Sequence, residues 1–189
     1  MRRCFSLVTA VLFCSVMPTH AQQKWGSLTG KVTLDGDIPA AVNLIPQMMK
    51  NGNANDCLAA PANQKVGQVW TVDPKTKGVA NVFVFLKANK GQAFPIQPVD
   101  KVRKQPAVID QPFCAFLPHV IAHYPSYFDG EKQVPTGEKF IVKNSAKIAH
   151  NVKGTASSKS PHKSFNFIVT AGQELEVELK PQPNPFPLE

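Results

Sequence analysis

The sequence predicts an all-β domain, an antiparallel β-sandwich built from about seven short strands. Three observations favour it. Proline is frequent, with 17 in 189 residues, and helical periodicity is almost absent. Several segments carry the β-branched, aromatic and alternating residues that are typical of strands. Turn residues separate these segments without the β–α–β alternation of a parallel sheet. A small closed barrel is the alternative architecture.

The expected strands differ in how each one is covered. Residues 79–87, "VANVFVFLK", are apolar on both faces, which predicts a central strand covered on each side. Residues 114–124 contain Pro118, which predicts an edge or bulged strand. In residues 173–180, Leu175, Val177 and Leu179 are expected to face inward and the intervening glutamates to face water. The remaining predicted strands are residues 27–36, 106–110, 138–145 and 164–170.

Two long loops interrupt this pattern. Residues 39–69 are polar and rich in asparagine, with a short helix expected near residues 46–50. A loop of that length is uncommon in a compact domain unless something ties it down, and Cys57 in its middle is the natural tie. Residues 87–104 form a second loop, rich in Pro, Gln and Lys.

The first 21 residues have the pattern of a secretory signal peptide. Arg2 and Arg3 precede an apolar run over residues 5–17, and small residues end it at Ala21. The run is shorter than the roughly 20 apolar residues that span a bilayer, and a retained anchor is the alternative. Cleavage would leave one domain, residues 22–180, and a proline-rich tail, residues 181–189. We therefore expect a periplasmic or secreted protein with no transmembrane segment after cleavage.

The net charge of +8 comes from scattered basic residues rather than from a basic run. No aromatic residues alternate with them as they do on nucleic-acid-binding surfaces, so we predict no nucleic-acid partner. A mildly basic, solvated surface is the simplest interpretation. Docking to an acidic partner is the alternative.

Cys57 and Cys114 are the two cysteines outside the predicted signal peptide. In an oxidising compartment two such cysteines are expected to pair. The alternative is that Cys114 is a metal thiolate, because His119 and His123 follow it. Those two histidines would share a face on a helix, but on a strand they lie about 13 Å apart. A metal site at His119 and His123 is therefore the weaker alternative to ordinary polar or partly buried side chains.

No catalytic signature is present in the sequence. The chain lacks a G-x-S-x-G elbow, an H-E-x-x-H motif and a phosphate-binding loop. The glutamates of residues 173–180 alternate with apolar residues, as on a solvated strand face. The prediction is that the protein is not an enzyme.

His150 is the sharper candidate, because it follows a predicted strand and a polar turn in "KNSAKIAHN". A loop at a strand end can hold an imidazole rigidly. Blue-copper sites are built this way, from two imidazoles and one thiolate in a plane with a weak axial thioether. A single histidine followed by asparagine is weak evidence when taken alone.

Four segments strengthen the interpretation of His150 as a metal ligand: "GVANVFVFLK", "PAVIDQPFCAFLPHV", "GEKFIVKNSAKIAHNV" and "SFNFIVTAGQELEVEL". In this order they resemble the cupredoxin-like exported bacterial proteins of the plastocyanin or methylamine-utilisation type, from Trp25 onward. The most specific matches are Cys114, Phe116, Pro118, His119, Val120, Asn144, Ser145, His150 and Asn151. The resemblance implies a Greek-key fold and an electron carrier with a redox partner in the envelope.

The resemblance also implies roles for individual residues. Cys57 and Cys114 would form a structural disulfide, and His150 would be the first copper ligand. Asn144 and Asn151 would support that ligand by fastening the neighbouring loops.

The chain departs from the family after its last predicted strand. The family continues into a Cys-x-x-His-x-x-Met loop and a closing strand, whereas here no Cys, His or Met follows His162. We therefore expect copper to bind weakly or not at all. One hypothesis is that the sequence is a truncated copper protein. The other is a metal-free β-sandwich that serves binding or assembly at the envelope, with the sheet completed by a partner or by the tail.

Overall fold

The computed structural model describes residues 25–89, 92–158, 160–180 and 188. Within these ranges the chain forms mostly strands, in three small sheets, with few and short helices. The helices are α1 (Ile45–Met48), α2 (Ala54–Leu58) and the 3₁₀ turns Ala62–Gln64 and Pro98–Asp100. The strands are β1 (Ala107–Asp110), β2 (Ser126–Phe128), β3 (Gln133–Pro135), β4 (Phe140–Lys143), β5 (His150–Gly154), β6 (Phe165–Val169) and β7 (Glu174–Glu176). The predicted β-rich fold is confirmed. The signal peptide and most of the tail lie outside the described residues.

The largest sheet has the strand order β1-β4-β7. Strand β7 runs antiparallel to β4, with Val142 opposite Leu175. Strand β1 runs parallel to β4, with Ile109 opposite Val142, so the prediction of purely antiparallel pairing is wrong here. A parallel pair needs a long crossover, and residues 111–139, which include the β2–β3 hairpin, supply it.

Strands β5 and β6 form a separate antiparallel pair in which His150 lies opposite Val169. Strand β5 was not predicted, because "HNVKG" offers one strongly apolar residue, Val152, to the pattern. Residues 150, 152 and 154 are nevertheless more buried than residues 151 and 153, as strand alternation requires.

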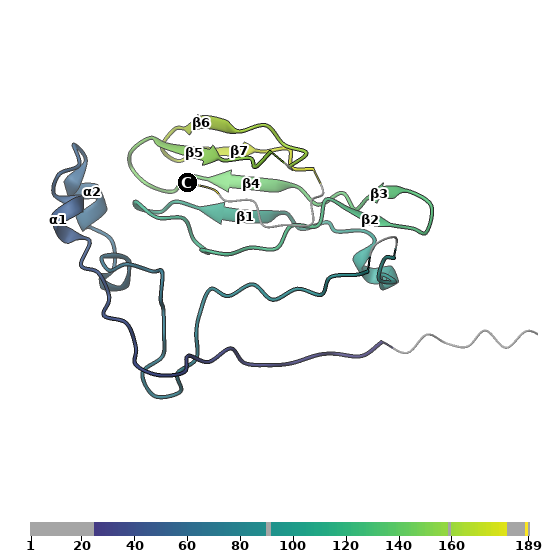
Figure 1. Cartoon of the computed structure of the whole chain (residues 1–189). Coiled ribbons are helices and arrows are strands. Elements are labelled where there is room, and N and C mark those ends of the chain that lie inside the picture. The colour runs from purple at the N-terminus through teal and green to yellow at the C-terminus, as the bar shows by residue number, and fades with distance from the viewer. Residues whose placement is uncertain (1–24, 90–91, 159, 181–187, 189) are drawn as a thin grey trace, which may run out of the picture.

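A hydrophobic core joins the β1-β4-β7 sheet to the β5–β6 pair, whose strands lie next to each other in Figure 1. Its buried members come from β1, β4, β5, β6 and the residue after β7: Ala107, Ile109, Phe140, Val142, Val152, Val169 and Val177. Leu175 and Leu179 pack against it, and the glutamates between them are exposed, so the predicted alternation is confirmed. Leu188, in the predicted tail, also packs on this core and forms a bridge to Gly154.

Three of the predicted strands do not form, and the first two are residues 27–36 and 114–124. Residues 27–36 make only one isolated bridge, Thr33 to Gly78, and their side chains find no core to cover them. Residues 114–124 make one bridge, Leu117 to Asp110, and then leave the sheet. Pro118 follows directly and has no N–H with which to extend the ladder.

Residues 79–87 are the clearest correction, because the expected central strand is not part of any sheet. In Figure 1 this stretch runs as an extended chain alongside the strands rather than among them. Apolar residues on both faces predict burial, but burial also needs neighbouring strands. No strand of the described chain pairs with this one.

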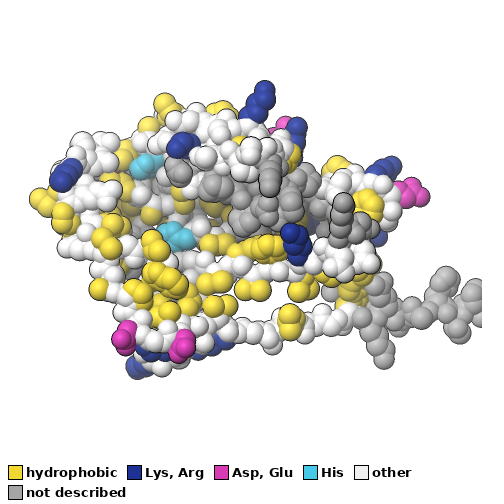
Figure 2. Space-filling view, viewed as in Figure 1, with side chains coloured by type: hydrophobic (Ala, Val, Ile, Leu, Met, Phe, Trp, Pro, Cys, Tyr) yellow, Lys and Arg dark blue, Asp and Glu magenta, His cyan; other side chains and the backbone are white. Residues whose placement is uncertain are grey.

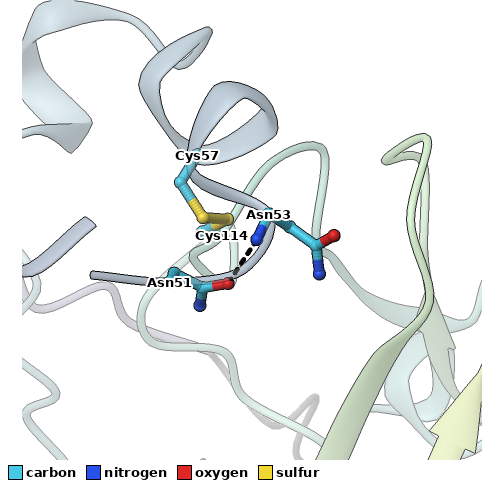
Figure 3. Close-up of a disulfide and its surroundings, with 4 residues drawn as sticks. All are labelled: Asn51, Asn53, Cys57 and Cys114. Atoms are coloured by element: carbon cyan, nitrogen blue, oxygen red, sulfur yellow. Dashed lines mark hydrogen bonds between the residues drawn. A yellow bond between two sulfur atoms is a disulfide. The ribbon is translucent and has the colours of Figure 1, made fainter. Parts of the chain in front are cut away.

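The asparagine-rich loop is tied to the rest of the molecule as expected. Cys57, in α2, forms a disulfide with Cys114, and the two Cα atoms are 5.2 Å apart (Figure 3). The helix expected near residues 46–50 is confirmed as α1, whereas α2 was not predicted. None of the helices in the described ranges has the length and apolarity needed to cross a bilayer.

Candidate functional site

Asn144 anchors the turn that leads from β4 to the predicted copper ligand. Its side chain is fully buried, and Nδ2 donates to the carbonyls of Ile148 and Val169, both at 2.8 Å. Its Oδ1 accepts the N–H of Ala146 at 3.0 Å. These bonds fasten the β4–β5 turn to the end of β6.

The main chain of Asn144 fastens the β6–β7 turn as well. Its N–H donates to the carbonyl of Gln173, and its carbonyl accepts the N–H of Gly172 at 2.8 Å. Gly172 has φ +72°, a left-handed conformation that favours glycine. A third connection follows β1, because Asp110 Oδ1 accepts the N–H of Ser145 and the carbonyl of Gln111 accepts that of Ala146. Three loops therefore meet at one end of the sheets.

His150 begins β5 at this same end, directly after the β4–β5 turn. It shares the inward face of β5 with Val152 and is half-buried. Its Nε2 is buried and has no hydrogen-bond partner among the described residues. Oε1 of Gln111, the residue after β1, is also buried without a hydrogen-bond partner among the described residues. Buried polar atoms are normally satisfied, so these two are the exceptions at this end of the fold.

Asn151 points to the opposite face of β5. It is exposed, and its Nδ2 donates to Oδ1 of Asn166 in β6 at 3.0 Å. Of the two asparagines predicted to fasten loops around His150, Asn144 makes such bonds, and Asn151 joins neighbouring strands instead.

His119 and His123 are held differently from one another. His119 is exposed. The His123 ring is half-buried, lies 5.5 Å from the ring of Phe140 and bonds the carbonyl of Glu138 at 3.3 Å through Nε2. The two segments that carry them form no helix that would place both rings on one face.

Among the described residues, none offers His150 the thiolate that a blue-copper centre needs. The thiols of Cys57 and Cys114 are joined to each other, so neither offers a thiolate. The described part of the chain brings together no group of three or more His, Cys, Asp or Glu side chains suited to a metal. What this end of the fold offers is one partnerless imidazole nitrogen.

Residues 82–86, "VFVFL", form a second candidate site that we call the apolar segment. Val84 and Leu86 are 74% and 69% exposed, and the rings of Phe83 and Phe85 stack at 5.9 Å. Their backbone groups make no hydrogen bond to the described residues. The chain is held just before them, where Val79 donates to Val32 and Ala80 donates to Thr71. Asn81, with φ +58°, then turns the segment away from these contacts.

Hydrophobic side chains form patches on the face shown in Figure 2, where most Lys and Arg side chains stand singly and some gather beside acidic ones at the lower left.

Sequence reasoning missed one charged cluster. Glu138 is nearly buried, with its side chain 5% exposed, and its Oε1 accepts the Nε–H of Arg103 at 2.8 Å. Its other oxygen accepts the N–H of Tyr124, whose ring lies under the Arg103 guanidinium. A lone Glu before a strand gives no signal of such a partner, since the arginine lies 35 positions away.

No family model, curated protein or solved structure matches this chain. The resemblance to cupredoxin-like proteins therefore stays a prediction.

Proposed function

We propose that this chain is an exported, metal-free β-rich module that binds an extended strand of a partner protein through residues 82–86. The observation that carries the proposal is the apolar segment, which is extended, exposed and unpaired along its backbone. In β7, by contrast, apolar and charged residues alternate, and the apolar residues are covered by the core.

The physical argument rests on what an extended chain needs. Unpaired N–H and C=O groups in a row form a template for another strand. A partner strand added to such an edge gains main-chain hydrogen bonds, and pockets for alternate side chains give specificity. Residues 82–86 are apolar on both faces, so pairing would also cover surface that is costly to leave in water. Soluble monomers seldom leave such runs uncovered without a purpose.

The envelope location rests on the sequence and is supported by the disulfide. Disulfides persist in oxidising compartments, and the Cys57–Cys114 bond ties the helical loop to the sheets. The two packed sheets are consistent with the Greek-key sandwich that the resemblance implies, which we propose as the finer description of the fold.

A short fluorescent peptide of alternating valine and threonine tests strand binding directly. We expect its anisotropy to rise when the protein is added. A Val84→Lys variant should bind at least about tenfold more weakly, because a charge would enter the paired face. Val69→Lys is the matched control, because Val69 is 90% exposed but lies outside the apolar segment. Equal binding by both variants would contradict the proposal.

Copper-dependent electron transfer is the second candidate, and the buried, partnerless Nε2 of His150 favours it. Against it stands the disulfide, which leaves Cys57 and Cys114 without a free thiolate, so we propose that the chain binds copper weakly or not at all. Adding cupric ion to the purified protein should give no intense thiolate-to-copper absorption band. If such a band appears, a thiolate is available and the metal-free proposal is wrong.

An enzymatic role is the third candidate, with no observation in its favour. We propose that the chain has no catalytic activity of its own. Hydrolase or oxidase activity that copurifies with the protein, and that is lost on unfolding it, would revive this alternative.

A further inference from the structure

Asn51 and Gly52 lie in the turn between α1 and α2, beside the disulfide (Figure 3). Both residues are exposed. Oδ1 of Asn51 accepts the N–H of Asn53 at 2.9 Å, which folds the side chain back along the Gly52 peptide. The Gly52 N–H makes no hydrogen bond within the described chain, and a Cβ built on Gly52 would meet nothing within 4 Å. The nitrogen that follows Asn51 in the chain is therefore exposed, uncrowded and not hydrogen-bonded to the described residues.

We propose that Asn51 is a site of spontaneous deamidation. The Gly52 nitrogen loses its proton to solvent base and attacks Cγ of Asn51, so that a C–N bond forms. The bond from Cγ to Nδ2 breaks, and the Nδ2 group leaves as ammonia after taking up a proton. Water then opens the cyclic imide at either carbonyl, which gives aspartate or isoaspartate. The net reaction is amide plus water to acid plus ammonia, with no oxidant or reductant.

The chain contains its own comparison sites, because "NGNAND" places asparagine at positions 51, 53 and 55. Asn53 is followed by Ala54, whose methyl group crowds the nitrogen that would attack. Asn55 lies within α2, where helical backbone geometry fixes the following peptide. Asn51 alone combines exposure, a glycine successor and an unbonded glycine N–H.

The reaction would change the junction of the two helices. The Asn51 N–H donates to the carbonyl of Met48 at 3.0 Å, and its carbonyl accepts the N–H of Ala54 at 3.1 Å. Isoaspartate adds a methylene to the main chain between these two bonds, so both cannot keep their geometry. Because Cys57 in α2 stays joined to Cys114, the loop should loosen without detaching from the sheets.

The test is to incubate the purified full chain, disulfide intact, at pH 6 and pH 8 and to map deamidation by mass spectrometry. We expect Asn51 to react several times faster than Asn53 or Asn55, and faster at pH 8. Gly52→Ala should slow the reaction at Asn51 severalfold and leave the other two rates unchanged. Electron-transfer fragmentation should find isoaspartate at position 51. Equal rates at the three asparagines, no reaction at Asn51, or no effect of Gly52→Ala would each overturn the proposal.

Discussion

The side-chain amide of Asn144 is bonded to the main-chain carbonyl of Val169 at 2.8 Å, across the gap between the residue after β4 and the last residue of β6. Removing it leaves that carbonyl and the carbonyl of Ile148 without this partner inside the fold. We predict that Asn144→Ala lowers the free energy of unfolding by about 3 kcal/mol, because each buried unsatisfied group costs about 1–3 kcal/mol. Urea unfolding of the disulfide-intact protein measures this.

The matched control for Asn144 is Asn151→Ala. Asn151 is exposed and bonds one side chain, Asn166. Its loss should change the stability by no more than about 0.5 kcal/mol. Equal costs for the two substitutions would mean that Asn144 does not fasten the loops.

The disulfide joins residues 57 positions apart, so it restricts a long loop in the unfolded chain. Replacing both Cys57 and Cys114 with alanine should cost about 4 kcal/mol in the chain-entropy model. Mapping under non-reducing conditions should recover one linked peptide that contains both cysteines. Recovery of the two as free thiols would contradict the pairing and reopen Cys114 as a metal ligand.

Glu138 should contribute more to the free energy of unfolding than Glu176, which is exposed at the end of β7. We predict that Glu138→Ala costs about 2 kcal/mol, because Arg103 and the Tyr124 N–H both lose the nearly buried carboxylate, while Arg103 keeps its bond to Asp100. The control is Glu176→Ala, which breaks the exposed ion pair with Lys139 and should cost at most about 1 kcal/mol. Thermal unfolding measures the midpoints of the two variants. Equal midpoints would contradict the prediction.

Acid should weaken the β2–β3 hairpin through Asp129. The backbone N–H groups of Lys132 and Glu131 lower the pKa of its carboxyl below the ordinary value of 3.8. A lowered folded-state pKa means that this contribution to stability is fully present above the ordinary value. It is lost as the pH falls through the lowered one. An NMR titration of the Asp129 carboxyl carbon should show the lowered pKa, and a midpoint at or above 3.8 would contradict the prediction.

Local pattern was enough to predict β4, β6, β7 and the turn residues between them. Leu175 and Val177 alternate with glutamates, and a glycine at position 172 permits the φ that the turn requires. The cysteine pairing followed from the expected compartment. The inward position of His150 was not predicted, because β5 was not.

Non-local relationships were beyond the same reasoning. Strand direction depends on which strands pair, so neither segment's sequence indicates that β1 pairs with β4 in parallel. The pattern of residues 82–86 shows that they need cover on both faces, but not whether the chain provides it. The bond between Arg103 and Glu138 joins residues that lie far apart in sequence.

Hydrogen–deuterium exchange over residues 82–86 tests the central proposal most directly. In the free protein their amides should exchange nearly as fast as those of an unstructured peptide, while the amide of Val142 in β4 should be protected. Adding the strand peptide should slow exchange in the apolar segment and leave Val142 unchanged. Protection of residues 82–86 equal to that of β4, without any partner, would contradict the account, because the segment would already be paired within its own chain.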